Sequence, residues 1–170
     1  MLQVVIDVAR PPVSLGRRYL HRGVTISSDG TPVSVAVGDL NTGAKPDIVI
    51  ATSTDAFVSA YLGNGDGTFQ PRLTSAALDR AMQVLLGDFD ADGKLDVVLV
   101  RGNSYSNKDA AAILLPGKGD GTFRSAQRYT TDYTASAEVV GDFNSDGLLD
   151  LVTANTDAAT VSVLLNTGVK

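Results

Sequence analysis

GDFDADGKLD, at residues 87–96, is the most informative stretch of this 170-residue sequence. Counted from Asp88, it places acidic side chains at positions one, three, five and nine, and a glycine, Gly93, at position six. Aspartate favours turns and supplies the hard oxygen ligands that Ca²⁺ prefers, while glycine permits a sharp turn. The spacing therefore predicts a tight calcium-binding loop.

The loop begins like that of an EF-hand, which also requires a bidentate glutamate at position twelve. Position twelve is Leu99, inside an apolar run, so we exclude an EF-hand. We predict that the ligands are four carboxylates and the backbone carbonyl at position seven. In order, these residues are Asp88, Asp90, Asp92, Lys94 and Asp96.

Two further stretches align with this loop without gaps, GDLNTGAKPD at 38–47 and GDFNSDGLLD at 141–150. The three stretches start 49 and 54 residues apart, at residues 38, 87 and 141. A second motif, GDGTF, occurs at 65–69 and returns 54 residues later at 119–123. Because the separate motifs keep one register, the chain contains an internal repeat, which is the signature of solenoids, propellers and arrays.

Short, β-branched apolar runs separate the motifs in each repeat, and no stretch has convincing helical caps and period. The runs are at 33–37, 48–52 and 57–62 in the first repeat and at 82–86, 97–100 and 111–115 in the second. With the segment after each GDGTF motif, they predict four-stranded antiparallel units. A four-stranded unit of about 50 residues has the size of a propeller blade.

The aspartate loop and the GDGTF turn, in this order, resemble the FG-GAP or VCBS repeats of integrin α-subunit-like β-propellers, over roughly residues 33–168. The resemblance implies an all-β fold of propeller blades. It also implies that each metal loop rigidifies the turn between a blade's first two strands. In that family the loops lie away from the face that binds partners.

We expect about three four-stranded blades. Residues 1–32 are predicted to hold the last strands of a partial blade, with 2–8 resembling a third strand and 19–26 a fourth. Blade 1 is expected at 33–81, blade 2 at 82–134, and blade 3, lacking its last strand, at 135–170. Propellers usually have four to eight blades. The chain is therefore expected to be a homodimer that completes a ring of about six blades, or a fragment of a longer propeller.

The other two loops have weaker ligand sets. In the third loop Asn144 replaces one carboxylate; in the first, Gly43 stands where an acid is expected and Ala44 replaces the turn glycine. Since calcium affinity follows ligand charge and rigidity, we predict the affinity order second, third, first. The candidate ligands of the third loop are Asp142, Asn144, Asp146, Leu148 and Asp150, and those of the first are Asp39, Asn41, Gly43, Lys45 and Asp47.

Each loop has an alternative interpretation as an aspartate-rich turn without metal. This alternative is weakest for the second loop, where four carboxylates within nine residues would repel one another without a cation. For the first loop the two interpretations are about equally supported, because a ligand is lost.

The composition of the chain excludes or disfavours several classes of function. The chain is 44% hydrophobic and 19% charged, which indicates a folded domain, and its net charge of -5 disfavours nucleic acid as a partner. No apolar run is long enough to span a membrane, and the first residues do not resemble a signal peptide. The absence of cysteine excludes disulfides and thiol nucleophiles and leaves the compartment open.

Catalysis has little support in the sequence. The single histidine, His21, is expected on a solvated strand, and there is no Gly-x-Ser-x-Gly elbow. The glycine-rich stretches at 63–67 and 117–121 lack the Lys-Ser or Lys-Thr of a phosphate loop, so we predict hairpin turns anchored by Phe69 and Phe123. Three tyrosines are candidates for ligand contact, with ordinary packing as the alternative: Tyr105, Tyr129 and Tyr133.

These observations favour a non-catalytic recognition or adhesion module, outside the cell or at its surface, whose Ca²⁺ is structural. Extracellular modules bind calcium in the millimolar range that such sites suit. Its partner would be a protein or a glycan. Two alternatives stay open at this point: a sugar-binding lectin, and a calcium-dependent hydrolase that uses loop carboxylates and a metal-bound water.

Overall fold

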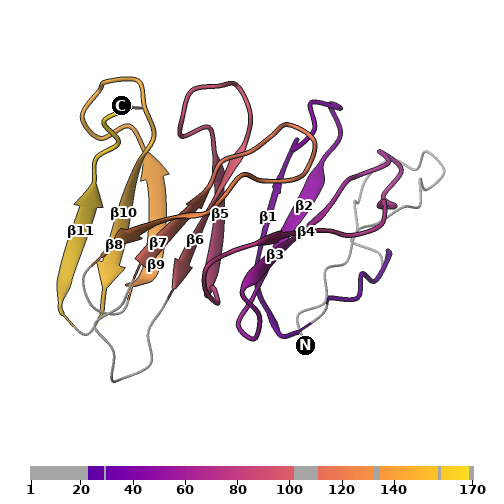
Figure 1. The fold of residues 1–170 in the computed structure, drawn as a ribbon, viewed down its shortest axis with the longest axis horizontal. Helices are drawn as coiled ribbons and strands as arrows, with labels where there is room; N and C mark the ends of the chain where they lie inside the picture. The colour runs from indigo at the N-terminus through magenta and orange to yellow at the C-terminus, as the bar shows by residue number, and fades with distance from the viewer. Residues whose placement is uncertain (1–22, 29, 102–110, 132–134, 157, 169–170) are drawn as a thin grey trace, which may run out of the picture.

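The computed structural model describes residues 23–28, 30–101, 111–131, 135–156 and 158–168. In these residues the chain is all-β, without helices, and three antiparallel sheets stand side by side (Figure 1). No helix that could span a membrane is found in the described part of the chain. The expectations for residues 2–8, His21, Tyr105 and Tyr133 lie outside it.

The first sheet has the strand order β1-β2-β3-β4, the second β5-β6-β7-β8 and the third β9-β10-β11. All neighbouring strands are antiparallel, as expected for blades of a propeller. The bounds of the first sheet are β1 (Pro32–Gly38), β2 (Asp47–Thr52), β3 (Phe57–Tyr61) and β4 (Leu73–Ala76). Those of the second are β5 (Gln83–Gly87), β6 (Asp96–Arg101), β7 (Ala111–Leu115) and β8 (Gln127–Thr130). Those of the third are β9 (Ala135–Gly141), β10 (Asp150–Asn155) and β11 (Thr160–Leu164).

Each aspartate loop connects the first and second strands of a sheet. The last glycine of the first strand pairs with the first aspartate of the second, as Gly87 does with Asp96. The same pairing joins Gly38 to Asp47 and Gly141 to Asp150. The loops therefore lie at equivalent hairpin positions in all three sheets.

The core lies in the seams between neighbouring sheets. In the first seam Val49 and Val58 of the first sheet pack with Val97 and Leu115 of the second, and Phe123 from the GDGTF turn joins them. The second seam has its own cluster around Val98 and Leu151. Because β2 and β6 are covered on both faces, the sequence of each is a nearly continuous apolar run.

Candidate metal centre

The loop between β5 and β6 brings three carboxylates together. One oxygen from each of Asp88, Asp90 and Asp96 lies within 4.8 Å of the other two. Ala91 and Gly93 turn the chain by adopting φ angles of 56° and 81°. Hard, charged oxygens at this separation are the ligand set that Ca²⁺ prefers.

Asp96 is fully buried and fixed by backbone groups. Its two oxygens accept the N–H of Phe89 at 2.8 Å and the N–H of Gly117 at 2.7 Å. Burial raises the pKa of Asp96, partly opposed by these two hydrogen bonds. Because Gly117 belongs to the turn after β7, this carboxylate ties the metal loop to the outer half of the sheet.

Asp88 shapes the loop in a similar way. Its oxygens accept the N–H groups of Asp92 at 3.1 Å and Gly93 at 2.9 Å. An ionised carboxylate offers about four lone-pair positions. Asp88 and Asp96 each use two of these positions for backbone N–H groups, so two positions remain on each carboxylate. The backbone hydrogen bonds are therefore compatible with a bound cation, and the residues present fit calcium.

Asp92, the fourth predicted carboxylate, is turned elsewhere. It binds the Lys94 ammonium at 3.0 Å and the Arg124 guanidinium at 3.0 Å. The hydrogen bond from Lys94 holds the pKa of Asp92 below its usual range. Arg124 also reaches Asp90 at 3.3 Å. Two cationic side chains therefore offset the charge that was expected to require a metal.

Sequence reasoning missed Arg124. It lies 32 residues after Asp92 and directly after the second GDGTF motif, which folds back toward the loop. The signal was available, because GDGTF is followed by arginine in this repeat and by Gln70 in the first. Only the fold shows that this position faces the carboxylates.

The third loop keeps the frame of the second. Asp150 accepts the N–H groups of Phe143 at 2.9 Å and Asn166 at 2.7 Å, and Asp142 accepts those of Asp146 and Gly147. Its predicted carboxylates do not form a converging group like that of the second loop in the described residues. Asn144 instead donates from its amide to Asp146 at 2.9 Å.

The first loop keeps the same frame despite its missing ligand. Asp47 accepts the N–H groups of Leu40 at 2.8 Å and Gly63 at 2.7 Å. Asp39 accepts those of Gly43 at 3.0 Å and Ala44 at 2.7 Å. Ala44 adopts a φ of 54°, in the left-handed region that its glycine counterparts occupy in the other loops.

Asn41, Lys45 and Leu148 are further predicted ligands in the first and third loops. Asn41 accepts the N–H of Gly43 through its side-chain oxygen at 2.9 Å. Lys45 and Leu148 occupy the seventh positions, where their carbonyls were predicted to bind metal. These ligand assignments stay predictions.

The GDGTF motifs form turns closed by local bonds. Asp66 accepts from Thr68 and Asp120 from Thr122, and these bonds lower the pKa of both aspartates. Antiparallel bridges join Gly63 to Phe69 and Gly117 to Phe123, so both turns are hairpin-like. Of the three candidate tyrosines, the described Tyr129 is 44% exposed, and its hydroxyl donates to Gln127.

The family comparison agrees with this arrangement. A model of the FG-GAP-like repeat matches residues 44–99 and again 88–153, so the two matches together span about two thirds of the chain. A comparison with curated proteins found no match. The matches support the predicted FG-GAP or VCBS repeat, whereas the narrower likeness to integrin α-subunits stays a prediction. Two successive repeat matches, together with antiparallel sheets joined by aspartate loops, show that the chain belongs to the FG-GAP-like repeat family.

Proposed function

We propose that the chain is a calcium-binding β-propeller module for recognition of a protein or carbohydrate outside the cell or at its surface. The convergence of Asp88, Asp90 and Asp96 carries the calcium part of this proposal. Extracellular calcium is abundant enough to fill loops of moderate affinity. FG-GAP-like repeats serve as structural and recognition modules, which supports a non-enzymatic role.

The position of the loop favours a structural task for the metal. Asp88 follows β5, Asp96 begins β6, and Asp96 also holds the turn after β7 through Gly117. A cation between these carboxylates would join the ends of two strands and reduce their mutual repulsion. It would thereby stabilise the blade without taking part in a reaction.

We further propose that two copies complete a ring of about six blades, or that the chain works as a section of a longer propeller. Either arrangement covers sheet faces and edges that would otherwise invite aggregation. In both, the repeats supply a rigid frame and the partner binds elsewhere than at the calcium loops.

Calcium titration tests the metal proposal. Isothermal calorimetry of the full chain should show saturable calcium binding. Calcium at about 100 times the dissociation constant should stabilise the chain by roughly 2.7 kcal/mol, which corresponds to a rise of about 5–10 °C in melting temperature over EGTA.

Asp90→Asn should remove the tightest site, because it takes one of three converging charges. Asp55→Asn, on the loop between β2 and β3, removes the same charge away from the metal loops and should leave binding unchanged. No calcium heat, together with identical melting in calcium and EGTA, would contradict the proposal. Equal loss of binding in both variants would contradict the assignment to this loop.

A further inference from the structure

The third sheet exposes an apolar face on the side away from the second sheet. Val161 and Val163 of β11 share this face with Val139 of β9, because Val163 is opposite Val152 and Val152 is opposite Val139. The exposed fractions are 64% for Val161, 54% for Val163 and 57% for Val139. We call this surface, with Phe143 at its loop end, the open face.

The repeat shows what such a face is built to do. Counting back 103 residues, the sum of the 49- and 54-residue offsets, leads from Val161 to Val58 and from Val163 to Ala60. Both counterparts are 1% exposed, because the second sheet covers them. The open face therefore has the position and chemistry of a surface that a following sheet covers.

A complementary surface lies on the first sheet. Val35 and Val37 of β1 are 37% and 64% exposed. Their counterparts 49 residues later are Val84, which is buried, and Leu86, and both pack in the first seam. One chain thus carries both halves of a seam, one on its first sheet and one on its third.

At the outer edge of the third sheet, no described strand lies next to β11. In the described residues β11 pairs only with β10, whereas its counterparts β3 and β7 pair with the fourth strands β4 and β8. The third sheet therefore offers a row of backbone donors and acceptors beside the open face.

Residues 23–28 have the place of a fourth strand, but beside the first sheet. Ile26 packs against Ile48 and Ile50, and the Tyr61 hydroxyl donates to the Ser27 carbonyl at 3.0 Å. Ser75 of β4, 49 residues after Ile26, likewise contacts the following repeat, because its Oγ accepts the Phe123 N–H at 3.3 Å. The segment is thus placed as the last strand of a blade that precedes the first sheet.

We infer that the open face and the edge of β11 bind a second copy of this chain, which contributes its residues 23–28 as the fourth strand of the third sheet. The pairing of Val58 with Ser75 and of Ala60 with Leu73 gives the register. Transferred by the repeat offsets, it pairs Val161 with the partner copy's Ile26 and Val163 with its Val24. The inference rests on the proposed ring of two copies and is independent of the calcium loops.

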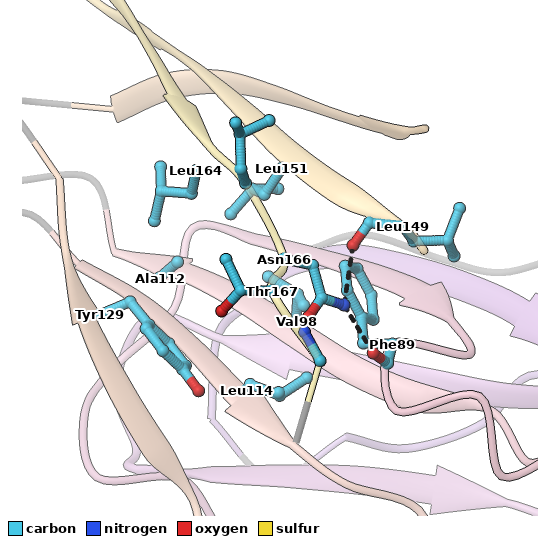
Figure 2. A pocket seen from close by; sticks show the side chains of 12 residues that line it. Phe89, Val98, Ala112, Leu114, Tyr129, Leu149, Leu151, Leu164, Asn166 and Thr167 are labelled. Atoms are coloured by element: carbon cyan, nitrogen blue, oxygen red, sulfur yellow. Dashed lines mark hydrogen bonds between the residues drawn. The ribbon is translucent and has the colours of Figure 1, made fainter. Parts of the chain in front are cut away.

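A cavity in the second seam fits this arrangement (Figure 2). It has a volume of about 180 Å³ and lies between the second and third sheets, beside Phe89, Val98 and Tyr129. Their counterparts in the first repeat are Leu40, Val49 and Ser75. Leu40 and Val49 belong to the same buried cluster as Phe123, and Ser75 accepts the Phe123 N–H. In the second seam the described residues leave the corresponding space open.

Light scattering on the full chain tests the inference, because the wild type should have twice the mass of one chain. Val161→Lys should give a folded monomer, since the side chain is exposed in the single chain and only the dimer buries it. Leu78→Lys changes a side chain that is 60% exposed outside both surfaces and should remain dimeric. Circular dichroism melting checks that each variant folds.

Mixing two variants gives a sharper test. Val37→Lys damages the first-sheet half of the seam and Val161→Lys the third-sheet half, so each alone should be monomeric. A mixture retains one undamaged seam and should form a heterodimer.

Since the chain has no cysteine, the double variant Ile26→Cys/Val161→Cys should form a disulfide-linked dimer on oxidation, whereas Ile26→Cys/Leu78→Cys should not.

A wild-type monomer would overturn the inference, and so would a dimer that Val161→Lys leaves intact. Calorimetry of Val161→Lys with calcium separates the two proposals. If the wild type is monomeric and calcium still binds, the surface assignment fails while the proposed calcium module stands.

Discussion

Glu138 gives the most quantitative prediction, because it is an acid buried in the fold. It lies on β9, its side chain is 6% exposed, and its Oε2 finds no hydrogen-bond partner among the described residues. Burial raises its pKa from 4.5 to about 7. The neutral acid is therefore the form that the fold prefers.

The magnitude and the sign follow from proton linkage. A pKa difference between 4.5 and about 7 corresponds to about 3 kcal/mol. Between these two values the folded chain binds more protons at this site than the unfolded chain. The contribution of the protonated Glu138 carboxyl to stability is complete below pH 4.5 and is lost as the pH rises through about 7. From pH 5 to pH 8 the loss amounts to about 2.5 kcal/mol.

Glu138→Gln preserves the shape of the side chain and removes its ionisation, so it should remove this pH dependence. Urea unfolding at pH 5 and pH 8, with EGTA present in every sample, measures the free energy of unfolding of variant and wild type. The advantage of the variant should grow by about 2.5 kcal/mol between the two pH values. Asp55→Asn, an exposed control, should show no such growth. A constant difference between Glu138→Gln and wild type would refute the reasoning.

Three further predictions address the loop, the turn and the seam. Arg124→Gln should raise the calcium affinity of the second loop about threefold to fivefold, measured by calorimetry. The reason is that the ion pair between the partly exposed Arg124 and Asp90, which competes with calcium, contributes up to about 1 kcal/mol. Unchanged affinity would show that Arg124 does not compete. Ala44→Gly should stabilise the chain by about 0.5–1 kcal/mol in urea unfolding by removing a left-handed alanine, and a loss of stability would contradict this. Phe123→Ala should lower the free energy of unfolding by about 3–5 kcal/mol and Phe69→Ala by clearly less, because Phe123 is buried in the first seam while Phe69 is half-buried. Equal losses would contradict the packing of Phe123 in the first seam.

The sequence was sufficient to predict the all-β blades because the apolar runs, the repeat spacing and the turn motifs all indicated the same four-stranded unit. The apolar run at 97–100 lies within β6, and the run at 111–115 coincides with β7. The aspartate loops were expected between a blade's first two strands, and they connect β1 to β2, β5 to β6 and β9 to β10. Local hairpins with a fixed turn chemistry are predictable in this way, because all their determinants lie within a few residues.

Contacts between repeats were less predictable. The ion pairs of Arg124 with Asp90 and Asp92 join residues 34 and 32 positions apart, and no local pattern gives their distance. Glu138 is the single glutamate of the chain, and its burial depends on how β9 packs in the second seam, which no local pattern gives. Because Arg124 and Lys94 pair with the aspartates of the second loop, counting the acids of that loop alone overestimated the repulsion that a cation must relieve.

The three loops also separate the shape of the turn from its capacity to bind metal. In each, the first and ninth aspartates accept the same set of backbone N–H groups, although the number of acids falls from four in the second loop to two in the first. Aspartates at these two positions can therefore persist for the fold alone. Among the four side-chain ligand positions, only the third and fifth vary, as Asp90 and Asp92 in the second loop and Asn41 and Gly43 in the first. Calcium binding should accordingly follow these two positions, and the turn should survive their loss.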